Sequence, residues 1–456
     1  MGERLIKMNY YLGIDFGTSG VKSAVINSES IIKFQGYYPL DNLKKGELIY
    51  SWENALWKLL GEISGGIRAE IKGIAINGTS STVMLCDDLG NPLQRYGNGK
   101  AIDSPLLYNY ACDSQIQEQI KQIAPPNHTV LSATSSLAKL VQLFWTLEKS
   151  SFSEDKSQSK YFLHQADWLG FLLHGKLGIS DYHNALKLGY DVEKLEYPDW
   201  LLNYLQEKLQ VSVHLPEVLA PGTVVGKLKP DISSKFGFSP DCVVCAGTTD
   251  SIAAFFASGA KSPGEAVTSL GSTLVLKLLS RTRVEDAKYG IYSHRFPSFN
   301  GEKQEELWLA GGASNTGGAV LKQFFSKSQL ESLSSQIDLT KTSKLDYYPL
   351  VGLGERFPIS DPNLKPRLAP RPDNDVEFLH GLFESMARIE SQGYRLLQEL
   401  GADDLTRVYT AGGGAANDIW RAIRERHLGV SVVRSDHVEA AYGTALLAMS
   451  GSQKNT

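Results

Sequence analysis

Two glycine-containing turns in this sequence carry side chains that could do chemistry. The first, within LGIDFGTSGVKSAVI at residues 12–26, sets Asp15 and Thr18 between two apolar runs. Asp, Gly, Thr and Ser are ordinary residues of a surface hairpin turn. Glycine also lets backbone N–H groups approach phosphate oxygens, because no Cβ blocks the approach. The stretch therefore indicates either a plain hairpin or a turn that holds a charged group.

The second turn repeats the pattern of the first. AVTSLGSTLVLKL, at residues 266–278, places Gly271, Ser272 and Thr273 between two apolar runs. Gly17 and Gly271 are separated by about one domain length. This weak internal repeat indicates two similar domains, each of which presents the N–H groups and hydroxyls of a hairpin turn to a cleft between them.

Asp250 lies where a catalytic carboxylate could be placed. In AGTTDSIAAFFASG, at residues 246–259, it follows a buried strand and opens an apolar helix. An acid in the first helical turn is also favoured by the helix dipole alone, by ~0.3–1 kcal/mol. At the carboxyl end of a central strand, however, the same acid could serve as a general base. The residues alone leave both interpretations open.

A further glycine stretch, TAGGGAANDIW at residues 410–420, lies between a strand and a helix. The helix N-terminus offers unpaired N–H groups and a positive dipole end, and such a turn can lie flat under a planar base. A tight strand–helix connection would look the same. No G-x-x-x-x-G-K-[ST] pattern occurs, and no G-x-G-x-x-G follows the first strand. A P-loop kinase or a Rossmann dehydrogenase is therefore not expected.

Composition narrows the class of protein. The chain has 456 residues, of which 42% are hydrophobic and 21% are charged, and its formal net charge is -4. We expect a globular chain of two domains. The lack of a basic block argues against nucleic acid and anionic membranes as partners. No apolar run is long enough for a signal peptide or a transmembrane helix, so we expect a cytoplasmic protein.

The four cysteines are Cys86, Cys112, Cys242 and Cys245. Two of them form CVVC within a run that we interpret as a buried strand. Residues i and i+3 of a strand point to opposite faces, so these two sulfurs could neither share a metal nor bond to each other. We predict buried core cysteines, and the spacing of the histidines indicates no metal site.

Apolar patterns predict the elements that must position the turns. Strands are predicted at residues 10–17, 21–27, 71–78, 82–88, 241–247, 266–273, 274–279, 407–414 and 430–435. Helices are predicted at residues 51–67, 135–149, 199–209, 376–401 and 415–429. Strands mixed with helices, some of them in hairpins, indicate an α/β protein with mixed sheets. The polar, serine-rich residues 149–160 are expected to form an exposed loop.

These motifs resemble, in order along nearly the whole chain, those of the FGGY carbohydrate kinases. DFGTSGVK is similar to the first phosphate hairpin of that family, GTTDSIAAFFASG to the block with its catalytic aspartate, and SLGST to its second phosphate hairpin. GGASNTGG looks like the following glycine segment, AGGGAAND like the adenosine motif, and EAAYGTALLA like the closing helix. Within this family, the chain looks most like a cyanobacterial and plant branch described as D-ribulose or D-xylulose kinases. The features that it shares with that branch are its short length and the stretches NGTSSTVMLCD, QADWLGFLLHG and SDYHNALKLGY.

The resemblance implies a fold and a division into domains. The fold would be the two-domain actin/Hsp70/hexokinase-like ATPase fold, an α/β fold of ribonuclease H-like domains with a cleft between them. The N-terminal domain would be residues 1–258, with the sugar site and the first phosphate hairpin. The C-terminal domain would be residues 259–456, with the second phosphate hairpin and the adenosine site, and its last helix could pack back on the first domain.

The resemblance also implies roles for residues in a sugar kinase that uses ATP and Mg²⁺. Asp250 would accept the proton of the sugar hydroxyl that attacks the γ-phosphorus of ATP. Asp15 would lie near Mg²⁺, partly through water, and Thr18 would hold phosphates. The nucleotide would also contact Gly271, Ser272, Thr273, Gly311, Gly312, Gly412, Gly413 and Asn417. These separate roles suit phosphoryl transfer, because that reaction needs the substrates to be positioned, the phosphate charge to be neutralised and one group to orient the nucleophile.

For the sugar, the first candidate is Ser80 in NGTS, at the end of a predicted strand. Asp15 and Asp250 could also bond to sugar hydroxyls. Asp167 in QADWL is a further candidate, although it could equally cap the helix that follows. Trp168 is expected in the core.

One stretch departs from the family pattern. Many xylulose and glycerol kinases carry a Trp-x-Asp-x-Arg stretch whose acid and arginine help to bind the substrate. The corresponding region here, LLYNYACDS at residues 106–114, has Tyr110 in place of the acid and no arginine. This departure favours a pentulose other than D-xylulose, and the resemblance to the cyanobacterial and plant branch implies D-ribulose, phosphorylated at its terminal C5 hydroxyl, with D-xylulose as the alternative. Only small-molecule partners, and a monomer or homodimer, are expected.

Two other classes of protein remain open. A chaperone-type ATPase or a filament protein of the same fold would need a further domain or an exposed contact surface, and the block around Asp250 argues against both. A binding protein that keeps ATP but is catalytically weak is disfavoured by the presence of Asp15, Thr18 and Asp250.

Overall fold

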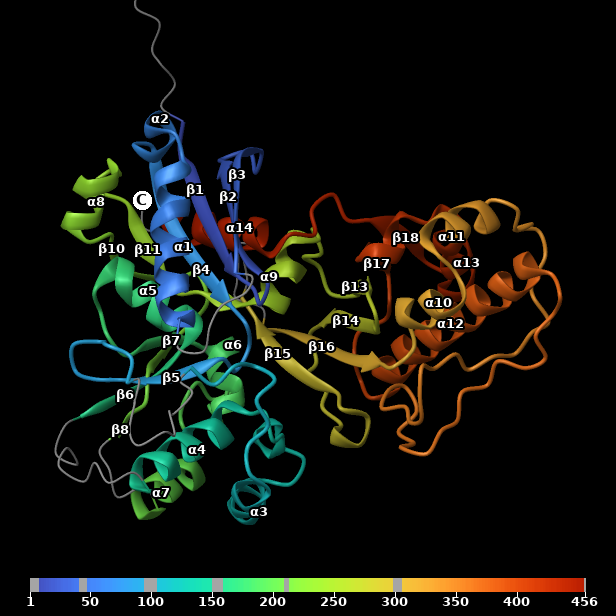
Figure 1. Cartoon of the computed structure of the whole chain (residues 1–456), viewed down its shortest axis with the longest axis horizontal. Helices are drawn as coiled ribbons and strands as arrows, with labels where there is room; N and C mark the ends of the chain where they lie inside the picture. Colours follow the sequence, from blue (N-terminus) through green and yellow to red (C-terminus); the bar gives the residue numbers. More distant parts are fainter. Residues whose placement is uncertain are drawn as a thin grey trace, which may run out of the picture. The chain divides into compact units, whose positions relative to one another are not determined.

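The chain forms two compact units (Figure 1). The computed structural model describes residues 8–40, 47–93, 105–149, 159–208, 213–297 and 306–454. Unit 1 comprises Met1–Ala257 and Glu439–Thr456, and unit 2 comprises Ser258–Val438. Most of the serine-rich stretch expected to be a loop lies outside the described residues. Among the described helices, none combines the length and apolar composition needed to cross a bilayer.

Unit 1 is built on a mixed sheet with the strand order β10–β11–β4–β1–β2–β3. Its strands are β1 (Tyr10–Phe16), β2 (Gly20–Asn27), β3 (Ile32–Pro39), β4 (Ile71–Gly78), β10 (Val224–Lys227), β11 (Val243–Cys245) and the short β12 (Thr248–Thr249) beside β4. β1 and β2 form the predicted antiparallel hairpin, whereas β4 runs parallel to β1, β11 and β12. The carboxyl ends of β1, β4 and β12 therefore meet at one edge of the sheet.

Side-chain alternation in β1 separates the two faces of this sheet. The covering helices are α1 (Leu48–Glu62), α5 (Gln165–His174), α9 (Asp250–Ala257) and α14 (Ala440–Gln453). Leu12, Ile14 and Phe16 share a core cluster with residues of α1 and α5. Tyr11 points to the other face, into a cluster with residues of α14. Figure 1 shows α14, red because it closes the chain, beside the blue strands β1 and β2.

Helix α14 approaches the sheet and α9 closely because glycines stand at the contact points. A Cβ on Gly13 of β1 would overlap the α14 backbone at Ala441. A Cβ on Gly443 of α14 would overlap the carbonyl oxygen of Ala253 in α9. Only glycine permits such close packing of backbones. The start of α14 is thereby held near the start of α9, the helix that Asp250 opens.

A third cluster extends unit 1 beyond the main sheet. Its elements are β5 (Val83–Cys86), β6 (Lys160–His164), β8 (Val213–His214), α3 (Ser114–Ile123), α4 (Ser136–Lys149) and α7 (Asp199–Lys208). The three strands form a separate sheet in the order β5–β6–β8. Their apolar side chains pack with those of α3, α4 and α7. The smaller elements of unit 1 are β7 (Ile179–Asp181), β9 (Glu217–Leu219), α6 (Tyr182–Ala185) and α8 (Pro230–Phe236).

Unit 2 repeats the strand pattern of unit 1. Its sheet has the order β15–β16–β14–β13–β17–β18. The strands are β13 (Glu265–Leu270), β14 (Leu274–Ser280), β15 (Tyr292–Phe296), β16 (Leu307–Ser314), β17 (Arg407–Ala411) and β18 (Ser431–Arg434). β13 and β14 form an antiparallel hairpin and β17 runs parallel to β13, as β4 does to β1. The internal repeat seen in the sequence therefore corresponds to equivalent positions in two sheets of like topology.

The core of unit 2 lies between its sheet and its helices. These are α10 (Gly318–Phe324), α11 (Lys327–Ser334), α12 (Asp375–Glu399) and α13 (Asp418–Leu428). Leu276 and Leu278 of β14 pack in one cluster with Phe378 and Leu382 of α12. The long helix predicted at residues 376–401 is thus confirmed, and its apolar face covers the sheet.

One predicted helix is interrupted. The helix expected at residues 51–67 ends at Glu62, and a separate short helix, α2, spans Gly65–Arg68. The residue after α1, Ile63, has an extended backbone with ψ 133°. Ser64 follows Ile63, and Gly65 and Gly66 then begin α2. Glycine lowers the stability of a helix interior, which disfavours one continuous helix through these positions. The helical spacing of apolar residues continues to residue 67 in the sequence, but the helical backbone is interrupted after Glu62.

The cysteines are buried and free, as predicted. Cys242 packs in the cluster beneath α1 and α5, whereas Cys245 packs in the cluster beneath α14. The two sulfurs of CVVC therefore lie on opposite faces of the sheet.

Candidate functional site

The strand registers place four polar residues in one row across unit 1. Asp15 of β1 is the register partner of Lys22 in β2 and of Asn77 in β4, and Asn77 is the partner of Thr248 in β12. Asp250 follows β12 directly and begins α9. The two acids singled out from the sequence, 235 positions apart in number, therefore lie at the same edge of one sheet.

Asp15 occupies an environment that disfavours its negative charge. Burial and then the charge of Asp250 raise the pKa of Asp15 from 3.8 to about 7, and Glu439 adds to the shift. The positive charge of Lys22 and a hydrogen bond from Asn77 act in the opposite direction. Asp15 Oδ1 is buried and has no hydrogen-bond partner among the described residues. The protein thus leaves one carboxylate oxygen available to a cation or to a bound donor.

The end of the chain completes the surroundings of Asp15. Lys22 Nζ donates to Glu439 Oε2 at 2.5 Å, at the residue that precedes α14. Asn77 Nδ2 donates to Thr444 Oγ1 of α14 at 2.6 Å, while Asn77 Oδ1 is buried without a partner in the described ranges. Sequence reasoning missed all four of these side chains. The Lys in DFGTSGVK and the acid in EAAYGTALLA lay inside quoted motifs, but nothing in the sequence joined them.

The β1–β2 turn is held by its backbone and leaves its tip exposed. Gly17 N donates to Gly20 O at 3.1 Å, and Ser19 O accepts from Leu40 N at 3.0 Å. Thr18 and Ser19 are exposed. No described residue accepts a hydrogen bond from either of their N–H groups. The turn therefore offers two backbone donors and the Thr18 hydroxyl to a ligand.

A buried polar cluster supports the strand that leads to Asp250. His183 Nδ1 and Thr248 Oγ1 are 2.7 Å apart and hydrogen bonded. Asp181 caps α6, accepting from the N–H groups of His183 and Asn184 at 2.8 and 3.1 Å. Burial, with the nearby charge of Asp167, raises the pKa of Asp181 to about 7. At the start of α9, Asp250 Oδ1 accepts from Ser251 N at 2.7 Å. His183 was quoted in a motif but was not singled out from the sequence.

Ser80 is the one side chain of its turn that reaches the surface. Thr79, Ser81 and Thr82 are buried, whereas Ser80 is half-buried. Thr79 N donates to Gln165 Oε1 at 2.9 Å, and the hydroxyls of Thr79 and Thr82 are 2.6 Å apart. This turn follows β4 directly, so Ser80 extends from the same sheet edge that carries Asp15 and Asp250.

Asp167 is occupied within unit 1. Its Oδ2 accepts from His164 N at 2.9 Å and lies 2.8 Å from His164 Nδ1, which is the capping arrangement of α5. The carboxylate is almost fully buried. These contacts correspond to the helix-capping alternative for this residue. Trp168 lies in the core as expected and donates its Nε1–H to Gly90 O at 3.1 Å.

The β13–β14 turn of unit 2 has the same character as the β1–β2 turn. Gly271 O and Ser272 O accept from Gly318 N and Ala319 N, at 2.9 and 3.1 Å. The N–H groups of Ser272 and Thr273 have no partner within the described part of the chain. Gly317 and Gly318 pack against this turn, where a Cβ would come within 2.7 Å of Ser272 O and Gly271 O. They belong to the stretch GGASNTGG, whose first two glycines, Gly311 and Gly312, were the candidates from the sequence.

The glycine stretch after β17 lies against the same turn. A Cβ on Gly412, which has φ 83°, would come within 2.7 Å of Leu270 O, the residue before Gly271. A Cβ on Gly413 would meet nothing within 4 Å. Asn417 Oδ1 caps α13 by accepting from Trp420 N at 2.9 Å, and its Nδ2 donates to Ser334 Oγ at 3.0 Å. Gly413 therefore borders open space beside the turn, while the Asn417 side chain is held in place.

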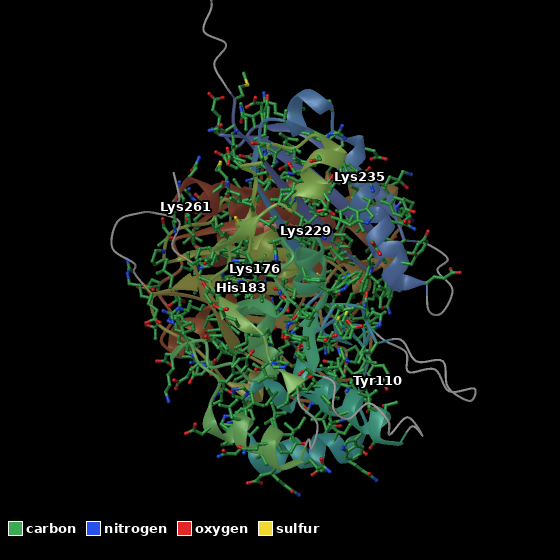
Figure 2. The ribbon with its side chains drawn as sticks, turned by 90° about the vertical axis from the view of Figure 1, so that its left-hand side faces the viewer. Tyr110, Lys176, His183, Lys229, Lys235 and Lys261 are labelled. Carbon is green, nitrogen blue, oxygen red and sulfur yellow. The ribbon has the colours of Figure 1, made fainter. Side chains whose placement is uncertain are left out.

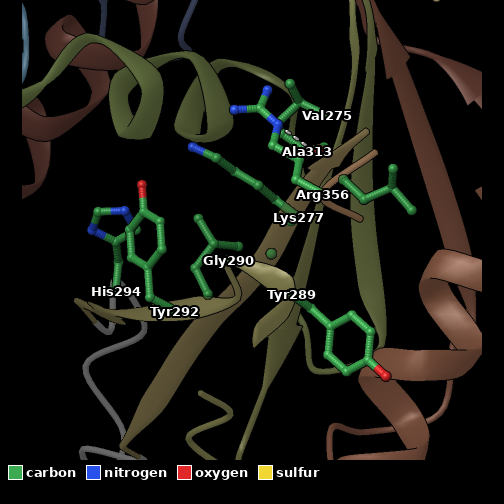
Figure 3. Close-up of a pocket in the computed structure, with 12 residues that line it drawn as sticks. Val275, Lys277, Tyr289, Gly290, Tyr292, His294, Ala313 and Arg356 are labelled. Carbon is green, nitrogen blue, oxygen red and sulfur yellow. Dashed lines mark hydrogen bonds between the residues drawn. The ribbon is translucent and has the colours of Figure 1, made fainter. Parts of the chain in front are cut away.

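Gly311 and Gly312 lie within β16 rather than in a turn, and they line a cavity of about 220 Å³ (Figure 3). Lys277, the register partner of Gly311, lines it together with Tyr292, His294 and Arg356. Figure 3 shows the charged ends of Lys277 and Arg356 on the same side of the sheet. No carboxylate is among the described residues that line it. Lys277 and Arg356 give this described lining a basic character.

No group of three or more His, Cys, Asp or Glu residues suited to a metal ion occurs in the described ranges. A cation at Asp15 would therefore need ligands from water or from a bound substrate. The orphaned oxygen of Asp15 and the nearby charge of Asp250 fit such a cation, because it would offset the repulsion between the two carboxylates.

Two family models match the chain. The model described as the FGGY family of carbohydrate kinases, N-terminal domain, matches residues 10–257, and that of the C-terminal domain of this family matches residues 266–452. The chain is similar to the xylulose kinase of Bacillus subtilis (strain 168), with 24% identity over 98% of this chain and 89% of that protein. It is also similar to a ribulokinase of Halalkalibacterium halodurans, with 22% identity over 60% of this chain and 54% of that protein.

Solved structures resemble the whole chain. A xylulose kinase from Bifidobacterium adolescentis superposes with a TM-score of 0.75 at 18% identity, covering 98% of this chain and 93% of that one. A structure titled as a xyloylose kinase from Brucella ovis gives a TM-score of 0.78 at 19% identity, covering 98% and 91%. The fold is the two-domain α/β fold of the actin/hexokinase-like ATPases, as the sequence predicted.

Proposed function

The chain belongs to the FGGY family of carbohydrate kinases and is a sugar kinase, and we propose that it transfers the γ-phosphoryl group of ATP to D-ribulose. The product would be D-ribulose 5-phosphate. The observation that carries this proposal is the placement of Asp15 and Asp250 at one sheet edge, beside a turn with free backbone donors. Asp250 can then accept the proton of the attacking hydroxyl, while Asp15 can hold the cation that neutralises the phosphates.

Asp250 is the proposed general base. It would accept the proton of the attacking sugar hydroxyl as the new O–P bond forms and the bond to ADP breaks. Its position supports this role, because it opens α9 at the carboxyl end of β12 and its strand is braced by His183. A base fixed in this way is held ready for the hydroxyl before the reaction begins.

Asp15 is the proposed carboxylate for Mg²⁺, partly through water. When bound, the ion neutralises charge on the phosphates that are in transfer. The buried, unpaired Oδ1 and the raised pKa support this role, since both describe a carboxylate without its counter-charge. Lys22, paired with Glu439, contributes a positive charge next to Asp15.

ATP is the proposed phosphoryl donor, and its phosphates would be held by backbone N–H groups. In unit 1 these are the donors near Thr18, and in unit 2 those of Ser272 and Thr273 beside Gly271. The open space at Gly413 next to Gly412 and Asn417 supports an adenosine site at that turn. The basic cavity at Gly311 and Gly312 supports an anionic ligand on the same sheet of unit 2.

The acceptor is proposed to be a pentulose that meets Ser80. Relatives named as xylulose kinases and ribulokinases support a five-carbon ketose. D-ribulose is preferred because residues 106–114 have Tyr110 where many xylulose kinases of the family have an acid. D-xylulose is the second candidate, and the number of relatives named as xylulose kinases favours it.

Release of ADP from Mg-ATP tests the proposal. The rate would be measured with D-ribulose, D-xylulose, L-ribulose, glycerol and no sugar. A strong increase with D-ribulose alone is expected. An increase with D-xylulose alone would replace the proposed substrate, and an equal rate across the panel would indicate a catalytically weak ATP-binding protein.

A further inference from the structure

Lys139 is a fully buried lysine for which the proposed reaction has no role. It lies in α4, with 0% of its surface exposed. Its Nζ donates to Ser81 O and to Leu107 O, each at 2.7 Å. These two hydrogen bonds, here called the Lys139 bridge, join segments that follow different strands.

No carboxylate compensates the charge of this lysine. Lys139 forms no ion pair within the described ranges, and its acceptors are two neutral carbonyl groups. Burial lowers the pKa of Lys139 to about 8; the neighbouring Cys112 opposes the shift, and the charge of Lys187 adds to it. Burying an ammonium group without a partner charge is costly. This unfavourable burial indicates that the Lys139 bridge has a role other than stabilising the fold.

The first bridged segment is the turn that carries Ser80. Ser81 has φ 62°, a conformation that residues other than glycine rarely adopt, so the turn is held by its contacts. Ser81 Oγ is buried and has no hydrogen-bond partner among the described residues. An unsatisfied buried hydroxyl beside a half-buried serine indicates a place where a polar ligand completes the hydrogen bonding.

The second bridged segment is the turn from Leu107 to Tyr110. Leu107 O also accepts from Tyr110 N at 2.9 Å, and Tyr108 N donates to Thr82 Oγ1 at 3.0 Å. Tyr108 and Tyr110 are 43% and 39% exposed, so two exposed aromatic side chains belong to a segment that is hydrogen bonded to the Ser80 turn. Figure 2 shows Tyr110 among the teal segments of unit 1, which include α3 and α4.

We propose that Lys139 is a positioning residue that holds the Ser80 turn and the Tyr108–Tyr110 turn together as two adjoining walls of the acceptor-sugar site. Hydroxyls of the first wall bind hydroxyls of the sugar, and the aromatic rings of the second wall cover its carbon skeleton. Lys139 itself does not touch the sugar. The inference rests on the proposed function, because it assigns these turns to the acceptor.

The test compares Lys139→Met with the matched control Lys187→Met. Both substitutions remove a positive charge in the same region, but only the first removes the Lys139 bridge. In Lys139→Met we expect the KM for the sugar to rise by about tenfold, in keeping with the loss of hydrogen bonds to a charged donor, while the KM for ATP stays within about twofold. Lys187→Met is expected to leave both constants unchanged.

Hydrogen exchange gives a readout that does not depend on turnover. Amide exchange in residues 79–82 and 106–112 is expected to become faster in Lys139→Met, while α12 of unit 2 serves as an internal reference. Lys139→Gln, whose amide can still donate, provides a milder variant if Lys139→Met does not fold, and a smaller change in the same two segments is expected.

The two ideas fail in different ways. Unchanged exchange in both segments, or equal rises in the KM for sugar and for ATP, would overturn the role of Lys139. A wild-type protein that turns over none of the sugars would overturn the proposed function, whereas faster exchange in the variant would still establish the bridge between the two turns.

Discussion

His183 Nδ1 and Thr248 Oγ1 lie 2.7 Å apart, so a histidine of α6 is hydrogen bonded to the two-residue strand β12, which ends directly before Asp250. Both residues are buried. Among the described strands, β12 pairs with β4 alone, and the histidine supplies a second support. The position of the proposed base thus depends on a contact between segments 65 residues apart.

Replacement of His183 by Phe tests this support. The substitution keeps an aromatic ring but leaves the buried Thr248 hydroxyl without its partner, at a cost of about 1–3 kcal/mol. We expect kcat to fall by about tenfold with the KM for ATP nearly unchanged. Steady-state kinetics and thermal unfolding would be measured together. A lower melting temperature with full kcat would mean that His183 serves stability alone.

Asp250→Asn tests the base directly. The amide keeps the size of the side chain but cannot accept a proton, so sugar-dependent ADP release should fall by about 10²–10⁴-fold. Binding of ATP, measured by calorimetry, should be retained. Wild-type turnover in this variant would contradict the assignment of Asp250.

The raised pKa of Asp15 predicts a pH-dependent stability in the absence of Mg²⁺. The folded protein keeps Asp15 protonated up to a pH of about 7, whereas the unfolded chain releases that proton near its ordinary value of 3.8. Stability is therefore lost as the pH rises from about 4 to about 7. Asp15→Asn, which stays neutral, should melt at a higher temperature than the wild type at pH 8, by about 2–4 °C per kcal/mol of relieved repulsion.

The same comparison has two controls. At pH 4 to 5 the difference between Asp15→Asn and the wild type should shrink, because Asp15 is then protonated in the folded protein. Added Mg²⁺ should raise the pH 8 melting temperature of the wild type and not of the variant. A wild type that is the more stable protein at pH 8 without metal would contradict the proposed repulsion between Asp15 and Asp250.

Gly443→Ala tests the contact between α14 and α9. The added Cβ would overlap the carbonyl oxygen of Ala253, so one helix must shift. We expect a loss of stability of about 1–3 kcal/mol, the usual cost of overpacking, together with reduced turnover because α9 begins at Asp250. Gly66→Ala is the matched control, since a Cβ at Gly66 meets nothing within 4 Å. Equal melting temperatures for the two variants would show that α14 and α9 can shift apart to accommodate the added methyl group without loss of stability.

Much of the fold was predictable because the relevant signals are local. The apolar runs on either side of Gly17 and Gly271 predicted two hairpins, and both are present with the expected antiparallel pairing. The spacing of apolar residues also predicted α12 over nearly its full length. The break between α1 and α2 was missed, because the apolar spacing continued past Ile63 and Ser64, where the helical backbone is interrupted.

The site was predictable only in part. Asp15, Thr18 and Asp250 could be singled out because an acid or hydroxyl in a glycine-containing turn, or at the end of a strand, is recognisable from the neighbouring sequence alone. Gly311 and Gly312 were singled out as a glycine segment, yet they lie in β16, and Gly317 and Gly318 are the glycines that meet the β13–β14 turn. Lys139 gave no signal at all, because a lysine in an amphipathic helix is ordinarily solvated.

The sequence by itself determined the two hairpins, the alternation of strands and helices, and the identities of the acids at the turns. Each of these depends on residues that are neighbours along the chain. Only the tertiary structure decided that Lys22, Asn77 and Glu439 act on Asp15, and that Thr444 holds Asn77. It also decided that His183 braces the strand before Asp250. Those contacts join residues tens to hundreds of positions apart, and register and helix packing, rather than local pattern, bring them together.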